Sequence, residues 1–299
     1  MRGLIVEVSP VSNNTSIAHV RNSLYLKKQT GFDICWNDET ILSALRKQYD
    51  VLVFSYSSKF APHDLMARLI ENNKTAKLFW MINEYNGSVP KCLRDAGNIS
   101  VIANFDKIPG RDYGYACEWL NVDLNTWIIP RDEQTINDKK YSAVFYGTWR
   151  PGRAKYMKKY LQDGVYCSSS AKNHKFFRDA GCKPKFIEKL SWQQRKESLS
   201  LFNASLYIED EFTHSHYNRM SNRFYEALYC NSVPAFDQSC AGTVRKSGYP
   251  IPDDWFIDDA KQLTWFDSSK HEKQIRELFS MALDEKITHT RKTLEYIGL

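Results

Sequence analysis

The first third of the chain alternates short apolar runs with amphipathic segments, and this alternation constrains the fold more than any other feature. Each run has about the length of one strand, as in DVLVFS at residues 50–55. Continuous apolar runs are typical of strands buried on both faces, as in parallel sheets covered by helices. The predicted strands are 4–8, 32–36, 50–55, 78–82 and 99–103, and the predicted helices are 17–28, 39–48, 62–72 and 89–95.

The alternation stops at a polar stretch, residues 130–140, and then restarts. The second set of predicted strands is 143–146, 165–167, 206–208 and 233–236, and the second set of predicted helices is 154–161, 192–202, 219–229 and 271–297. We therefore predict two Rossmann-like α/β domains, residues 1–135 and 136–285, with a C-terminal helix at 286–299 that packs back on the first domain. Ligands bind at the carboxyl ends of such strands, so the cleft between two such domains is the expected site.

Composition narrows the class of protein. Hydrophobic residues make up 42% of the 299, enough for two cores, and no apolar run reaches the roughly 18 residues of a membrane span. The opening MRGLIVEVSP lacks the pattern of a secretory signal, because Glu7 interrupts its apolar run. The seven cysteines form no C-x-x-C pair, which favours a reducing cytoplasm and predicts no dedicated metal site. A net charge of +6 permits a polyanionic partner without identifying one.

The first motif is FYGTWRPGRAKYMKKYL, residues 145–161, in which a strand ends and a basic helix begins. Gly147 permits a close turn, and Pro151 suits a helix start. The free N–H groups of a helix start bind phosphate, and arginine adds a planar donor fork that fits phosphate oxygens. Arg150 and Arg153 therefore predict a diphosphate site. The alternative is that they are two surface arginines at a helix start.

The second motif is a helix, a turn and a strand, NRFYEALYCNSVPAF at residues 222–236. Arg223 and Glu226 lie three residues apart and share one helix face. A carboxylate in such a position suits the two hydroxyls of a ribose. The alternative is an ordinary ion pair within the helix, and spacing alone favours that alternative.

Taken together, the two motifs resemble the GT-B glycosyltransferases. EALYCNSVPAF is similar to their donor-nucleotide signature, and VFYGTWRPGRAKYMKKYL more closely resembles the diphosphate-binding segment of the DNA β-glucosyltransferases of T-even phages. The resemblance covers residues 143–237. It implies that Arg150, Arg153 and Arg223 hold the diphosphate of a UDP-sugar beside Gly147, and that Glu226 holds the ribose.

The resemblance also implies a catalytic base at the end of the fourth strand, where those enzymes have an aspartate. Glu84 is the nearest carboxylate in this chain, so it matches by position and not by identity. An acceptor hydroxyl is a poor nucleophile and needs such a carboxylate within hydrogen-bond reach. Glu7 and Asp106 are weaker candidates, and Glu84 is alternatively a solvated strand end.

These expectations describe a UDP-sugar-dependent enzyme with a GT-B fold. It would move glucose or arabinose, with inversion, to 5-hydroxymethylcytosine or a related base in double-stranded phage DNA. The expected protein is a monomer of the host cytoplasm, without membrane attachment, and stimulation by a divalent metal stays open. The alternatives are a transferase acting on a cell-surface glycan and a non-catalytic nucleotide- or DNA-binding protein.

Overall fold

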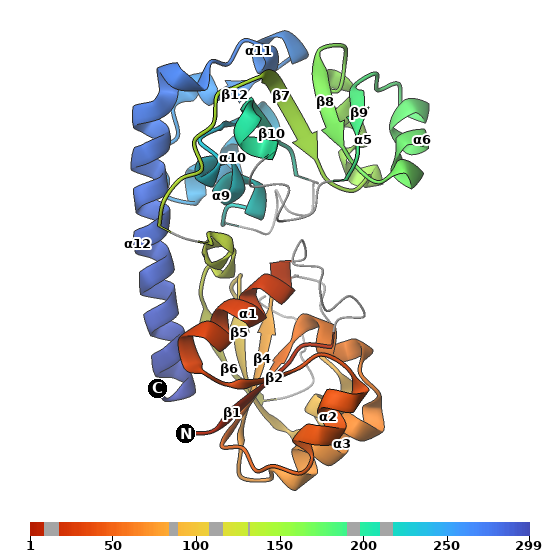
Figure 1. The fold of residues 1–299 in the computed structure, drawn as a ribbon, viewed down its shortest axis with the longest axis vertical. Helices are drawn as coiled ribbons and strands as arrows, with labels where there is room; N and C mark the ends of the chain where they lie inside the picture. The colour runs from red at the N-terminus through yellow and green to blue at the C-terminus, as the bar shows by residue number, and fades with distance from the viewer. Residues whose placement is uncertain (9–17, 84–88, 108–115, 131, 190–197, 210–217) are drawn as a thin grey trace. The chain divides into compact units, whose positions relative to one another are not determined.

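The computed structural model describes residues 1–299 apart from 9–17, 84–88, 108–115, 131, 190–197 and 210–217. The chain divides into two compact units (Figure 1). Unit 1 comprises Met1–Ile128 together with Glu285–Leu299, and unit 2 comprises Ile129–Asp284. Each unit contains a parallel sheet with helices against it, which confirms the predicted α/β class.

Within its described residues, unit 1 has a six-stranded sheet in the order β2-β1-β3-β4-β5-β6, with every neighbouring pair parallel. The strands are β1 (Gly3–Val6), β2 (Asp33–Cys35), β3 (Val51–Ser55), β4 (Lys77–Ile82), β5 (Asn98–Ala103) and β6 (Ala116–Asn121). The first five lie within or beside the predicted runs. The sequence did not predict β6, because this edge strand, ACEWLN, carries an exposed Glu118 at its middle instead of a continuous apolar run.

The helices of unit 1 lie on opposite faces of this sheet. They are α1 (Ala18–Thr30), α2 (Asp38–Ala44), α3 (His63–Asn72) and α4 (Lys91–Ala96), with short 3-10 turns η1 (Tyr56–Phe60) and η2 (Leu124–Ile128). Helices α2, α3 and α4 contact one another in sequence, whereas α1 contacts η2. A buried cluster joins Leu26 of α1 and Trp127 of η2 to the sheet residues Val53 and Phe79. Ile297 from the end of the chain completes this cluster, so the last turns of the final helix belong to the core of unit 1.

Unit 2 has a second six-stranded parallel sheet within its described residues, in the order β12-β11-β10-β7-β8-β9. The strands are β7 (Tyr141–Tyr146), β8 (Val165–Ser168), β9 (Lys185–Ile187), β10 (Phe202–Tyr207), β11 (Val233–Asp237) and β12 (Phe256–Ile257). The chain builds outward from β7 in one direction and then returns to add β10 on its other side. The edge strands β9 and β12 were not predicted, because each is only two or three residues long.

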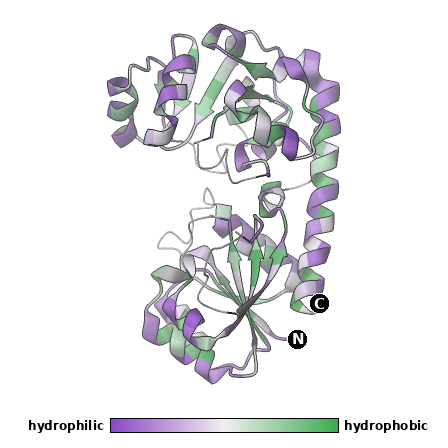
Figure 2. Ribbon diagram, turned by 180° about the vertical axis from the view of Figure 1, so that it is seen from behind, coloured by the Kyte–Doolittle hydropathy of each residue, from purple (hydrophilic) through white to green (hydrophobic). Residues whose placement is uncertain are grey.

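The described helices of unit 2 are α5 (Ala154–Tyr160), α6 (Ala171–Asp179), α9 (Asn222–Tyr229), α10 (Ala241–Lys246) and α11 (Ala260–Thr264), and α12 (Glu272–Ile297) continues from unit 2 into unit 1. Figure 2 shows the strands as the most hydrophobic segments and the outer turns of the helices as hydrophilic. The prediction of a helix at 192–202 is wrong over its last residues: Leu199–Leu201 is a 3-10 turn, and Phe202 already belongs to β10. Residues 192–197 lie outside the described part of the chain.

The polar stretch predicted as a linker packs on unit 2. The Thr135 amide donates to the Tyr229 carbonyl at 2.8 Å, and the Gln134 side chain donates to the Leu228 carbonyl, also at 2.8 Å. Both carbonyls lie at the end of α9, whose last turn leaves carbonyl groups without helical partners. The division between the units therefore falls at Ile128 and Ile129, a few residues before the expected boundary at 135.

Candidate donor site and catalytic carboxylates

The reversal of strand order between β7 and β10 fixes where a ligand would bind in unit 2. After β7 the chain continues toward one edge of the sheet, and after β10 it continues toward the other edge. The two connections leave a crevice at the carboxyl ends of these strands, and dinucleotides bind there in sheets of this order. Gly147 follows β7 directly, and Glu209 lies two residues after the end of β10. The first motif of the sequence therefore lies at the expected ligand position.

Gly147 has a backbone conformation and surroundings that only glycine tolerates. Its φ is +153°. A Cβ atom added there would lie 2.8 Å from Nη2 of Arg223 and 3.3 Å from the ring of Phe145. The missing side chain thus makes room for the Arg223 guanidinium.

Arg223 reaches the end of β7 from the first turn of α9. Its Nε donates to the Tyr146 carbonyl at 3.1 Å, and its Nη1 donates to Oε1 of Glu209 at 2.6 Å. The guanidinium also lies over the ring of Phe145, 5.5 Å from the ring centre. Burial is the largest single effect and lowers the pKa of Arg223, but the surrounding groups, Glu209 first, together outweigh burial and hold this pKa above its usual value. The side chain stays charged.

Arg153 meets the same carboxylate from the other side. Its Nη2 donates to Oε2 of Glu209 at 2.8 Å, and both side chains are almost fully buried. One carboxylate therefore pairs with two arginines. Two guanidinium groups held at the carboxyl edge of a parallel sheet present donors that suit an anion.

Arg150 occupies a different position from Arg153. It is exposed and extended, with φ −139° and ψ 129°, immediately before the 3-10 turn η3 (Pro151–Arg153). Its carbonyl accepts a hydrogen bond from the Arg153 amide at 3.0 Å, which closes the turn. One arginine of the motif is therefore exposed and the other is buried, and the buried Arg153 is the one that binds Glu209 among the described contacts.

Glu226 lies one turn beyond Arg223 on α9 and is 1% exposed. Its charge contributes to the raised pKa of Arg223, after the larger contribution of Glu209. The ion pair of Arg223 is made with Glu209, which follows β10, so Arg223 does not form the intrahelical pair that spacing favoured. Glu226 lies on the helix that supplies Arg223 to the switch point.

Sequence reasoning missed Glu209, the residue that joins the two motifs. The strand before it was predicted to end at Ile208, and nothing in the local pattern connects Glu209 with residues 56 and 14 positions away. One general signal was available. In a doubly wound sheet, the strand that begins the second half of the sheet pairs with the first strand, so a carboxylate just beyond that strand lies beside the end of the first one.

The proposed base, Glu84, lies outside the described residues. The structure describes β4 up to Ile82 and then Asn83, so the carboxyl end of this strand is where the prediction placed it. Strand β4 lies between β3 and β5 in the sheet of unit 1. The role of Glu84 therefore stays a proposal.

Glu7 lies at the point where the strand order of unit 1 reverses, between β1 and β3, but its carboxylate is fully buried. Ser23 donates to Oε2 at 2.7 Å, Ser57 donates to Oε1, and Nε2 of His19 lies 3.9 Å from Oε1. A carboxylate bound by two hydroxyls inside the protein is poorly placed to take a proton from an acceptor. Its contacts instead tie α1 and η1 to β1.

Asp106 is exposed and lies three residues after β5. Its Oδ1 accepts a hydrogen bond from Nδ2 of Asn121 at 2.5 Å, which ties the end of β5 to the end of β6. This carboxylate is accessible, so it remains a comparison residue for Glu84.

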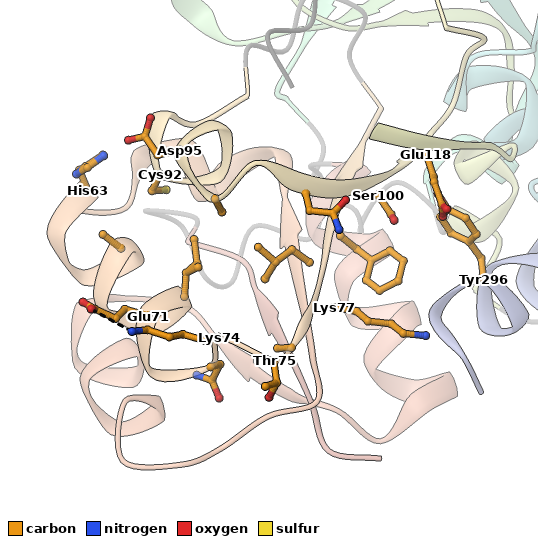
Figure 3. Close-up of a pocket in the computed structure, with 18 residues that line it drawn as sticks. His63, Glu71, Lys74, Thr75, Lys77, Cys92, Asp95, Ser100, Glu118 and Tyr296 are labelled. Atoms are coloured by element: carbon orange, nitrogen blue, oxygen red, sulfur yellow. Dashed lines mark ion pairs between the residues drawn. The ribbon is translucent and has the colours of Figure 1, made fainter. Parts of the chain in front are cut away.

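A pocket of about 860 Å³ lies at the opposite edge of the unit 1 sheet, where β4 and β5 begin (Figure 3). Lys77 and Asn98, the first residues of those strands, line it together with His63 and Glu118. On its rim, Lys74 pairs with Glu71 at 3.7 Å, both largely exposed. This amino-terminal edge is the wrong end of a parallel sheet for the predicted chemistry, so size alone does not make the pocket the active site.

The described residues hold no group of three or more histidines, cysteines, aspartates or glutamates arranged to bind a metal ion. In the part of the chain that the structure covers, no helix is long and apolar enough to span a membrane. Six cysteines of the described chain are buried and none is bonded to another.

Solved glucosyltransferases have a similar fold. T4 phage β-glucosyltransferase with its UDP-glucose substrate matches with a TM-score of 0.70 and 14% identity, covering all of both chains. An α-glucosyltransferase bound to UDP-glucose and to DNA with an abasic site matches with a TM-score of 0.70 and 11% identity, covering 100% of this chain and 99% of the other. The T4 phage β-glucosyltransferase bound to UDP and Mn²⁺ matches with a TM-score of 0.67 and 15% identity, covering all of both chains.

No protein-family model and no curated protein matches the sequence. The structural matches cover the whole chain, and they confirm the predicted GT-B fold, with two parallel sheets. At this low identity the likeness concerns the fold, and the chemistry has to be argued from the residues.

Proposed function

We propose that this protein is a glycosyltransferase that moves a sugar from a UDP-sugar to a base in DNA. The observation that carries the proposal is the convergence of Arg153 and Arg223 on Glu209 at the switch point of the unit 2 sheet, beside a glycine that leaves room for Arg223. A diphosphate is the part of a UDP-sugar that such a cationic site would recognise.

The donor would be held by residues of unit 2. Arg150, Arg153 and Arg223 would face the diphosphate, and Glu226 would accept hydrogen bonds from the ribose hydroxyls. Negative charge develops on the leaving diphosphate as the sugar departs, so fixed cations there stabilise the transition state more than the ground state. The two guanidinium groups bound by Glu209 are already in place for that step.

The acceptor half of the reaction would belong to unit 1. The Glu84 carboxylate would take the proton of the acceptor hydroxyl as its oxygen bonds to the anomeric carbon. The bond from that carbon to the diphosphate oxygen breaks in the same displacement, UDP leaves with the bonding electrons, and the configuration inverts. A base in duplex DNA would have to be flipped out of the stack to reach this position.

The proposed acceptor is 5-hydroxymethylcytosine or a related hydroxylated base, and the proposed sugar is glucose or arabinose. Support comes from the fold shared with enzymes solved with UDP-glucose and with DNA. The nearest competing function is transfer to a cell-surface glycan, which would keep the donor site and need no DNA surface. A non-catalytic nucleotide- or DNA-binding protein is the other.

Mass spectrometry of nucleosides tests the proposal directly. Hydroxymethylated duplex DNA is incubated with the protein and UDP-glucose or UDP-arabinose, digested and analysed for a hexose or pentose adduct, with unmodified DNA as the control. An adduct only on the hydroxymethylated base supports the proposal. UDP release without any DNA adduct would favour another acceptor, and no turnover of any UDP-sugar would favour a binding protein.

A further inference from the structure

The positive charge of this protein is concentrated in one segment. Residues 150–189 contain 11 lysines and arginines against three acidic residues, whereas the rest of the chain contains 30 basic and 32 acidic residues. The segment runs from η3 through α5, β8, α6 and β9 to the residues just beyond it. All the net positive charge of the chain therefore comes from this segment of the sequence.

Nearly all of this charge faces solvent. Ten of the 11 basic side chains are exposed, Arg153 being the buried exception. Helices α5 and α6 contact each other, and Figure 1 shows α6 beside β9. At the end of α5, Lys159 lies 3.2 Å from Asp258 and 3.7 Å from Asp237. A solvated face usually mixes both signs, so an excess of this size within one segment marks a surface for a polyanion.

Helix α6 presents the most regular part of this surface. Lys172, Lys175 and Phe176 are exposed and recur at the spacing that places residues on one helix face. Among the described residues, neither lysine has a carboxylate within ion-pair distance. Phe176 is 50% exposed, whereas its neighbour Phe177 is fully buried against the sheet. We define Lys172, Lys175 and Phe176 as the α6 face.

The α6 face is held rigidly and lies beside the donor loop. The Gly147 amide donates to the Ser168 carbonyl at 3.1 Å, so the residue that ends β8, just before α6, touches the diphosphate loop. His174 stacks on Phe186 with ring centres 4.2 Å apart, which fixes the first turns of α6 on β9. A strand of phosphates on the α6 face would therefore run close to the predicted donor site.

We propose that the α6 face docks the sugar–phosphate backbone of duplex DNA, with the two lysines contacting phosphates and Phe176 contacting the adjoining sugars. DNA, among polyanions, is chosen because the inference rests on the proposed function, which supplies a DNA acceptor. Lysines on a fixed helix recognise phosphate without reading sequence, so this surface would position any duplex and leave base choice to the catalytic site.

Salt-dependent binding tests this docking. Each phosphate contact adds about 0.9 to the slope of log affinity against log salt, so Lys172→Ala/Lys175→Ala is expected to lower the slope by about 1.8. At 0.15 M salt the same loss corresponds to weakening on the order of 30-fold. UDP affinity, measured by calorimetry, is expected to stay unchanged. An unchanged slope would overturn the proposal.

A matched variant separates docking from net charge. Lys246→Ala/Lys273→Ala removes the same charge from exposed positions of unit 2 that lie outside the basic segment. It is expected to leave the slope close to that of the wild type, and an equal loss in both variants would overturn the proposal. Phe176→Ala is expected to weaken DNA binding with the slope unchanged, and unchanged affinity would remove Phe176 from the docking surface and contradict the proposal as stated.

The outcomes keep the docking surface distinct from the proposed function. If the wild type binds duplex DNA through these lysines but transfers no sugar to it, the proposed function is wrong and the docking proposal is supported. If the wild type glycosylates DNA and the Lys172→Ala/Lys175→Ala variant has an unchanged slope of log affinity against log salt, the docking proposal is wrong and the proposed function is unaffected. A wild type that does not bind duplex DNA at low salt contradicts both.

Discussion

Arg223 donates to the Glu209 carboxylate over 2.6 Å, across the gap between the helix α9 and the end of β10. The other oxygen of Glu209 is bound by Arg153. Arg153 is buried and Arg223 is mostly buried, so the two cations that share this anion depend on it, because an uncompensated charge in the interior is costly. Glu209 therefore sets the geometry and the charge that any donor would meet.

Glu209→Gln is expected to destabilise the free protein by about 3–5 kcal/mol, the usual cost of breaking a buried pair from one side. A bound diphosphate would replace the lost anion, so UDP is expected to raise the melting temperature of the variant more than that of the wild type. Thermal melts with and without UDP measure both effects. Glu209→Asp, which keeps the charge, serves as the control, and an equal UDP shift in all three proteins would contradict a role beside the diphosphate.

Gly147→Ala is expected to push the Arg223 guanidinium out of place, because the new Cβ would lie 2.8 Å from Nη2. UDP affinity should fall along with stability. Gly164→Ala is the matched control, since Gly164 also has a positive φ, +92°, but a Cβ there would meet only a methyl group at an ordinary 3.7 Å. Both variants should therefore lose stability through backbone strain. Calorimetry should find the UDP defect in Gly147→Ala alone, and a similar defect in both would reduce the role of Gly147 to backbone strain.

Glu226→Gln is expected to weaken UDP-sugar binding, because the amide loses charge-assisted bonds to the ribose hydroxyls. Inorganic pyrophosphate lacks a ribose, so its affinity should change little. Competition binding of both ligands gives the two values side by side. An equal loss for pyrophosphate would instead indicate that Glu226 acts by orienting Arg223.

Lys139 gives a pH-dependent prediction for the end of α9, where it donates to the Cys230 carbonyl at 3.0 Å. Burial lowers the pKa of Lys139 from 10.5 to about 8. Between these values the unfolded chain binds the proton and the folded protein does not, so stability rises with pH through that interval. In denaturant melts, the free energy of unfolding of the wild type minus that of Lys139→Met should rise between pH 8 and pH 10.5. If this difference does not change with pH, the Lys139 ammonium is solvated in the folded protein.

The sequence predicted the parts of the site that depend on local signals. Gly147 and Pro151 follow an apolar run and precede a helix, and Arg223 and Glu226 share a helix with a strong apolar face, so each was placed from its neighbours in the chain. The partner of the arginines could not be found this way. Glu209 meets Arg153 only because β10 returns to pair with β7, and strand order is a property of the whole sheet.

Packing also decided which of two similar arginines is buried. Arg150 and Arg153 are equivalent in the sequence pattern, but the 3-10 turn points one to solvent and the other to Glu209. Likewise, Glu7 and Asp106 are both carboxylates near strand ends. Only the structure shows that Glu7 is held inside the protein by hydrogen bonds from Ser23 and Ser57. Burial of a polar side chain depends on partners that sequence position does not specify.

Glu84→Gln tests the catalytic half of the proposal. If Glu84 is the base, turnover should fall by roughly 10²–10⁴-fold, while UDP and DNA affinities stay those of the wild type. Wild-type activity should rise with pH through a carboxylate step, because only the ionised form accepts the proton, and the variant should lose that step. Asp106→Asn, at an exposed carboxylate bonded to Asn121, is the matched control and should keep its turnover. If Glu84→Gln keeps near-normal turnover and Asp106→Asn loses turnover, the base is Asp106. If Glu84→Gln no longer binds UDP, Glu84 contacts the donor instead.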